Sequence, residues 1–137
     1  MTLEELNRRI SEALKLRHTD PVAAATALLA LSEAAGELDR RPALLRTLGL
    51  VLQTLPSTPA TWELRLSVAR ALTEEEPNNL WNVIILAEAH AAKGEFKEAR
   101  ERCREAESLA HSERESSQIV AARQRIDAEE QKNGGGS

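Results

Sequence analysis

The chain is poor in aromatic residues and contains no tyrosine. Trp62, Trp81 and Phe96 supply all of the Trp, Tyr and Phe among its 137 residues. Proteins that bind single-stranded nucleic acids or RNA loops usually stack bases on aromatic rings. The 18 Lys and Arg residues are interspersed with 22 Asp and Glu residues, so the sequence also lacks the basic stripe that binds a phosphate backbone. We therefore expect no nucleic-acid partner.

Cysteine and long apolar segments are also scarce. Cys103 is the single cysteine, which excludes a disulfide within the chain and suits a reducing compartment. No apolar run approaches the roughly 20 residues that a membrane-spanning helix needs. No N-terminal stretch combines the basic flank, apolar centre and small-residue cleavage site of a secretion signal. We expect a soluble, cytoplasmic protein without a membrane partner.

Alanine and leucine are abundant. Both lead the helix-propensity ranking, and β-branched residues are sparse, which favours helix over sheet. Apolar residues recur at helical spacing between breaks that contain proline, glycine or asparagine. The pattern predicts an all-α fold of about seven short helices. Their expected ranges are 3–17, 21–35, 42–55, 59–75, 80–93, 96–110 and a last helix that follows the cap at 112 and runs through 126.

Capping residues stand at several of the predicted helix starts. Thr2 and Ser112 are each followed three residues later by glutamate, which is the pattern of a capping box. Asp20 precedes Pro21, which suits an N-cap followed by the first helical residue. Asp39 is expected to open the third helix.

Three glycines have separate expected roles. Gly36 is expected to end the second helix in a left-handed conformation, and Gly94 is expected to end the fifth. Gly49 lies inside the third helix, where glycine costs about 1 kcal/mol relative to alanine. We expect Gly49 to allow the close approach of a neighbouring helix.

Short connections join the predicted helices. Each connection spans two to six residues, which makes consecutive helices antiparallel neighbours. We therefore expect a single all-helical domain over residues 1–132, stacked as helical hairpins in a bundle or short solenoid. Residues 133–137 read Asn-Gly-Gly-Gly-Ser and are expected to form a flexible tail. The expected state is a monomer.

One segment carries a more specific pattern. It has a Pro-Asn-Asn turn at 77–79, a Gly-Glu-Phe turn at 94–96, and large or small packing residues at fixed positions: Leu86, Ala87, Ala89, Ala99, Ala106 and Leu109. Residues 77–110 thereby resemble one unit of a tetratricopeptide repeat. The resemblance implies a helical hairpin whose first helix binds a peptide with its inner face. The corresponding residues here are Trp81, Ile84, Glu88, Ala91 and Ala92.

The composition of this inner face differs from that of peptide-clamping members of the family. Such members use Asn and Lys to bind a C-terminal carboxylate, and the face here has neither. Glu88 would carry the wrong charge for that ligand. We expect the face to pack against another helix.

No arrangement of residues predicts a catalytic, cofactor or metal site. His18, His90 and His111 lack the i, i+4 spacing of paired metal ligands. Cys103 lies on an inward helical stripe, where a small packing residue is the simplest interpretation. Cys103 with His90 is a conceivable pair for a metal or nucleophilic role. The carboxylate runs are expected to be solvated at helix ends, namely 4–5, 74–76 and 129–130.

The remaining large or charged side chains are expected to serve packing and solvation. Trp62 and Trp81 are expected in the core between the fourth and fifth helices, with a role as binding anchors as the alternative. Glu98 and Arg102 are spaced i, i+4 and are expected to form an attractive surface pair.

The function that this sequence favours is that of a designed or engineered helical scaffold with no natural biochemical activity. Gly-Gly-Gly-Ser at 134–137 is linker chemistry, and helix capping is regular. One repeat-like unit is joined to helices that do not repeat it. The alternative is a natural tetratricopeptide-like adaptor that binds a peptide or partner helix in a groove between helices. An enzyme is not expected.

Overall fold

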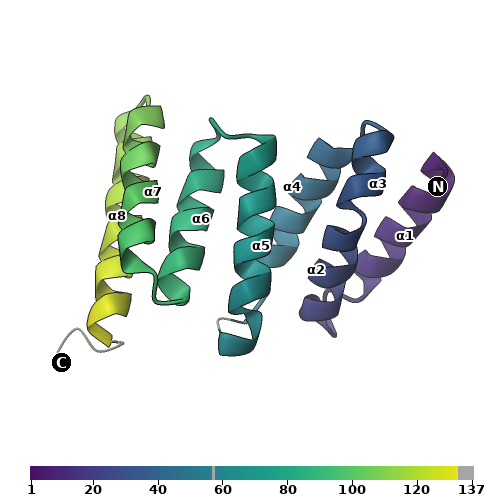
Figure 1. The fold of residues 1–137 in the computed structure, drawn as a ribbon, viewed down its shortest axis with the longest axis horizontal. Coiled ribbons are helices and arrows are strands. Elements are labelled where there is room, and N and C mark those ends of the chain that lie inside the picture. The colour runs from purple at the N-terminus through teal and green to yellow at the C-terminus, as the bar shows by residue number, and fades with distance from the viewer. Residues whose placement is uncertain (57, 133–137) are drawn as a thin grey trace. The chain divides into compact units, whose positions relative to one another are not determined.

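The computed structural model describes residues 1–56 and 58–132, which contain eight helices and no strand (Figure 1). The all-α prediction is therefore confirmed for the described residues. The chain divides into two compact units, Met1–Leu72 and Thr73–Ser137. The helices are α1 (Leu3–Lys15), α2 (Pro21–Ala30), α3 (Ser32–Glu37), α4 (Arg41–Leu52), α5 (Pro59–Glu75), α6 (Leu80–Ala92), α7 (Phe96–Leu109) and α8 (Glu113–Glu130). The expected tail, 133–137, lies outside the described residues.

In the described residues, no helix has the length and hydropathy that a membrane span requires. That residues 1–132 fold as a single domain stays a prediction.

Leucine side chains form the core of the first unit. In this unit α1 packs on α2, while α2 and α3 both pack on α4. Leucines at helical spacing supply the largest fully buried side chains because i, i+3 and i+4 positions share one face of a helix. These leucines are Leu6, Leu28, Leu44, Leu45, Leu48 and Leu66.

The predicted second helix, 21–35, is wrong in its continuity and its end. It is interrupted at Leu31, whose backbone N–H donates to the carbonyl of Leu28 at 3.1 Å, three residues back. An i→i−3 bond tightens the turn and closes α2. A new helix, α3, then begins at Ser32. Leu31 itself is buried, and no proline or glycine indicates the break in the sequence.

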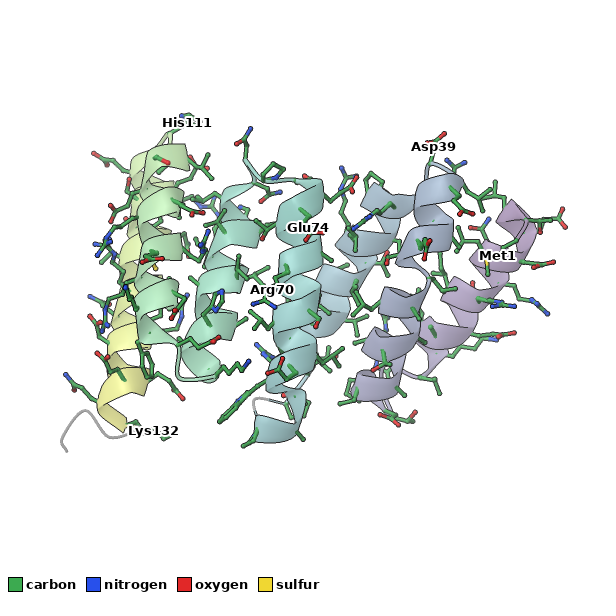
Figure 2. The ribbon with its side chains drawn as sticks, viewed as in Figure 1. Met1, Asp39, Arg70, Glu74, His111 and Lys132 are labelled. Atoms are coloured by element: carbon green, nitrogen blue, oxygen red, sulfur yellow. The ribbon has the colours of Figure 1, made fainter. Side chains whose placement is uncertain are left out.

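Asp39 lies in the turn that follows α3 (Figure 2). It is the left-handed residue there, in place of Gly36. Asp39 has φ of 56°, and its N–H donates to the Gly36 carbonyl at 3.3 Å. The N–H of Arg40 reaches back to the Ala35 carbonyl at 2.7 Å. These two bonds define a Schellman motif, in which the left-handed residue follows the C-cap. Gly36 is therefore helical, and Asp39 ends α3 rather than capping α4.

Gly94 occupies the equivalent position after α6, as predicted. Its φ is 88°, its N–H donates to the Ala91 carbonyl at 2.9 Å, and the N–H of Glu95 donates to the His90 carbonyl at 2.9 Å. The two helix ends thus share one hydrogen-bond pattern. Glycine fits the left-handed residue at one end, and aspartate occupies it at the other.

Gly49 in α4 does not serve the close helix approach that we expected. A Cβ atom built on Gly49 would lie 3.8 Å and 3.9 Å from the two δ-methyl groups of Leu72 on α5. These are ordinary van der Waals distances. The space would accept a methyl group, so packing does not require glycine there.

Three helices, α6, α7 and α8, build the second unit and pack on one another. Their shared core is a cluster of aliphatic, alanine and cysteine side chains. From α6 it takes Leu80, Val83, Ile84, Ala87 and Ala91, from α7 Ala99, Cys103 and Ala106, and from α8 Ile119, Ala122 and Ile126.

The N-caps expected at Thr2, Asp20 and Ser112 are present. The hydroxyl of Thr2 accepts a hydrogen bond from Glu5 N–H at 3.2 Å, and that of Ser112 accepts one from Glu115 N–H at 3.1 Å. The carboxylate of Asp20 caps α2 in the same way. The side chain of Glu115 accepts from the N–H of His111 at 2.8 Å. The return bond of this capping box therefore reaches one residue before the N-cap.

Candidate functional site

The face of α6 that the repeat resemblance identified is partly covered by the neighbouring helix α8. Ile84 and Ala91 are buried in the cluster that α6 shares with α7 and α8. Glu88 accepts hydrogen bonds at one carboxylate oxygen from Arg125 of α8, at 3.0 Å from Nε and 2.5 Å from Nη2. This part of the face therefore contacts another helix of the same chain.

Trp81 lies at the start of α6 and is 47% exposed. The expectation that Trp81 packs in the core is therefore wrong, while Trp62 is half-buried. The reason is local. Asn79 caps α6 by accepting from the N–H groups of Trp81 and Asn82, and the helix then buries Leu80, which places the adjacent Trp81 about 100° further around the helix.

His90 is buried near the end of α6 and contacts the residue before α7. Its Nδ1 lies 3.0 Å from Oε1 of Glu95. His18 and His111 are exposed, and Nε2 of His18 accepts from Nε of Arg17 at 3.2 Å. Within the described ranges, no three His, Cys, Asp or Glu side chains come together as potential metal ligands. The role of His90 in this structure is to join α6 to the connection that follows it.

The thiol of Cys103 is fully buried on α7. Burial raises its pKa, and a hydrogen bond and the charge of Arg123 oppose that effect in part. A raised pKa keeps the thiol protonated, and the protonated form is neither the nucleophile nor the metal-binding species. In this structure Cys103 is a core side chain.

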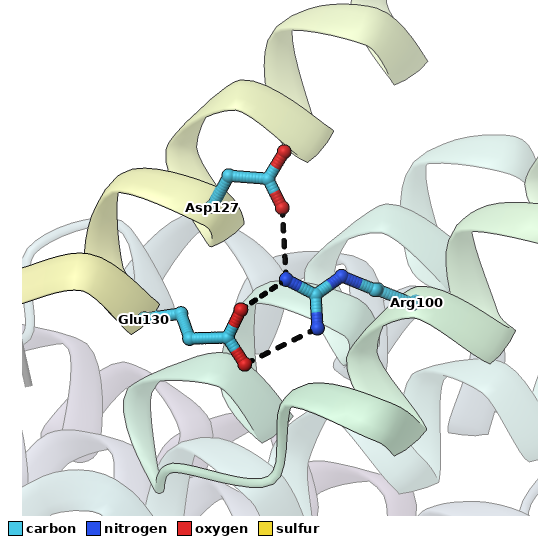
Figure 3. Close-up of polar contacts among 3 residues, drawn as sticks. All are labelled: Arg100, Asp127 and Glu130. Carbon is cyan, nitrogen blue, oxygen red and sulfur yellow. Dashed lines mark hydrogen bonds and ion pairs between the residues drawn. The ribbon is translucent and has the colours of Figure 1, made fainter. Parts of the chain in front are cut away.

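An arginine between two carboxylates connects α7 to α8 (Figure 3). The Nη2 atom of Arg100 lies 2.9 Å from Oδ1 of Asp127 and 2.5 Å from Oε1 of Glu130, and its Nη1 lies 3.3 Å from Oε2 of Glu130. Glu130 is thus held by both terminal nitrogens, the geometry that favours arginine over lysine. The hydrogen bond from Arg100 lowers the pKa of Glu130. The hydrogen bonds to Glu130 and Asp127 raise the pKa of Arg100.

Sequence reasoning missed this cluster. Glu130 was expected to be solvated at a helix end, and neither Arg100 nor Asp127 was selected. The available signal was the i, i+3 spacing of Asp127 and Glu130, which places two carboxylates on one helix face. Arg102 is also paired differently from the prediction, because it forms an ion pair with Glu105 rather than with Glu98.

Arg100 and Asp127 of this cluster also line a hollow. Its volume is about 310 Å³, and it is lined by Arg100, Arg104, Arg123, Ile126 and Asp127. Arg123 also pairs with Glu107 of α7 at 2.7 Å. A second, more open hollow of about 730 Å³ lies at the start of α8, and its lining residues are Ala110, His111, Ser112, Glu113, Ser116, Ser117 and Val120.

Comparison with known proteins found no matching family model, no matching curated protein and no matching solved structure. The resemblance of residues 77–110 to a tetratricopeptide unit therefore stays a prediction. The site must be interpreted from its own geometry.

Proposed function

We propose that the chain is a designed helical scaffold whose purpose is its shape and which has no natural biochemical activity. The observation that carries the proposal is the position of α8. Residues of α8 share one buried cluster with Ile84 of α6, and Arg125 of α8 pairs with Glu88 of α6. The face from which a repeat unit of this type would bind a peptide is thus used in part for packing within the chain.

The contacts of the second unit support the same proposal. Arg100, Arg123 and Arg125 each bind carboxylates on another helix. The charged side chains on α7 and α8 therefore reinforce the packing of helices that already share a core. These ion pairs are partly exposed, so each adds little to the stability that the shared core provides, and they join helices rather than form a reaction centre.

We further propose that α6 and α7 form an antiparallel hairpin of the tetratricopeptide type. A short connection joins the two helices, and the small residues Ala87, Ala99 and Ala106 are completely buried where the helices pack. An antiparallel arrangement brings the first residue of α6 close to the last residue of α7. Nuclear Overhauser contacts between Leu80 and Leu109 are the expected result, and their absence would contradict the hairpin.

The scaffold proposal is tested by titrating the full chain with unlabelled helical and extended peptides, including peptides with free C-terminal carboxylates. The chain has two tryptophans, so an amide spectrum contains two indole N–H signals, one from Trp81. We expect no saturable change in that signal or in the amides of α6 and α8. Saturable changes centred on these residues would contradict the scaffold proposal.

The exposure of Trp81 favours one alternative function, that of an adaptor for a peptide or partner helix. Exposed tryptophans are frequent anchors in protein interfaces. If the adaptor function is correct, a peptide from the panel shifts the Trp81 indole signal, and Trp81→Ala abolishes that binding. Trp62→Ala is the matched control, because it removes the other indole and leaves the start of α6 unchanged.

A further inference from the structure

Three guanidinium groups line the hollow between α7 and α8. Arg100 and Arg104 are one helical turn apart on α7, and Arg123 comes from α8. One carboxylate, that of Asp127, also lines the hollow, and Ile126 supplies an apolar wall. Arginine is the side chain that best matches the oxygens of phosphate, because its N–H groups form a planar fork. A volume of about 310 Å³ accommodates a small phosphorylated ligand.

Two of the three arginines are held in place by carboxylates of the neighbouring helix. Arg100 is held by Asp127 and Glu130, and Arg123 by Glu107 at 2.7 Å. Each guanidinium has five N–H donors, and the contacts with these carboxylates use only some of them. The two groups are therefore oriented before a ligand arrives, which lowers the entropy cost of binding.

Arg104 differs from the other two. It is exposed and makes no hydrogen bond or ion pair within residues 1–56 and 58–132. It lies at i+4 from Arg100, where two like charges repel each other. An anion between them would remove this repulsion and give Arg104 a partner.

We propose that this hollow binds a phosphate group, either inorganic phosphate or a phosphomonoester. The carboxylates of Asp127, Glu130 and Glu107 offset the formal charge of the three arginines. Hydrogen bonding therefore contributes more than net charge, and we expect binding in the millimolar range. The proposal does not rest on the scaffold function.

The test is a titration of the full chain, labelled with ¹⁵N, at constant ionic strength maintained with sodium chloride. One arm uses inorganic phosphate and the other uses phosphoserine. In both arms we expect saturable shifts of the side-chain Nε–H signals of Arg100, Arg104 and Arg123. Tighter binding of phosphoserine would identify the phosphomonoester as the better ligand, and tighter binding of phosphate would favour the free ion.

Arg104→Met is the decisive variant because Arg104 is exposed and has no hydrogen-bond or ion-pair partner among the described residues, so their fold does not depend on it. Its loss should weaken phosphate binding about tenfold, as expected for one charged hydrogen-bond partner. Arg114→Met is the matched control, since Arg114 is an exposed arginine of α8 that does not line the hollow. Equal affinities in the two variants, or shifts that do not saturate, would overturn the proposal.

Discussion

Replacement of Gly94 by alanine should destabilise the second unit through the backbone alone. Gly94 has φ of 88°, and a Cβ atom built on it would have no neighbour within 4 Å. A clash therefore plays no part. An L-residue in the left-handed region costs about 1–2 kcal/mol, so we expect the free energy of unfolding to fall by about 1 kcal/mol or slightly more.

Gly49→Ala is the matched control, because the same methyl group is added in a different backbone conformation. Gly49 is in the interior of α4, where alanine is preferred to glycine by about 1 kcal/mol. The added methyl would meet Leu72 at 3.8 Å, an ordinary contact that adds a small packing gain. We therefore expect Gly49→Ala to raise the free energy of unfolding by about 1 kcal/mol.

Urea denaturation followed by far-ultraviolet circular dichroism measures both effects. The chain divides into two compact units, so residue-specific hydrogen exchange should accompany it to show in which unit stability changes. Opposite signs for the two substitutions are the expected result. If Gly94→Ala leaves the midpoint and slope unchanged, or if Gly49→Ala destabilises, the reasoning from backbone conformation is refuted.

Three further predictions follow from the described contacts. Asp39→Gly should stabilise the first unit by about 0.5 kcal/mol in urea denaturation, because glycine carries no left-handed penalty; a loss of stability would show that the Asp39 side chain contributes more than its backbone costs. Ile126→Ala should lower the free energy of unfolding by about 2–5 kcal/mol, because Ile126 is buried. Val120→Ala is its control: Val120 lies on α8 and is 54% exposed, so the free energy of unfolding should change by less than about 0.5 kcal/mol. Because the pKa of Glu130 is lowered in the folded state, its ionised carboxylate stabilises the protein at pH values above the ordinary glutamate pKa of 4.5, and this stabilisation is lost as pH falls through the lowered pKa. Glu130→Gln should remove that pH dependence. Identical curves of stability against pH for the variant and the parent would contradict the prediction.

The sequence predicted the features that depend on local chemistry. The caps at Thr2, Asp20 and Ser112 follow from side chains that bond to N–H groups within the same turn. The all-α class follows from apolar residues at helical spacing. Trp81 was predicted wrongly because a large apolar side chain next to a cap has no local signal for the face it occupies.

The break at Leu31 and the left-handed residue at Asp39 required the structure. Leu31 is a good helix former, and its burial in the core is decided by packing rather than propensity. Gly36 was the stronger candidate for a helix end because glycine accepts a positive φ at the least cost. The chain instead continues as helix to Glu37 and uses aspartate for that conformation.

The ion pairs of the second unit show why the candidate site itself could not be predicted from sequence. Arg100 is 27 residues from Asp127 and 30 from Glu130, and Arg125 is 37 from Glu88. A long arginine side chain can reach a carboxylate on its own helix or on a neighbouring helix. Residue spacing along one helix predicts only the pairs within that helix. Once α8 packs on α6 and α7, the carboxylates of the neighbouring helix become available, and bidentate contact favours them. These ion pairs form only once the helices have packed, so packing of the core brings together the three arginines that line the hollow. No sequence pattern within α7 or α8 alone indicates that grouping.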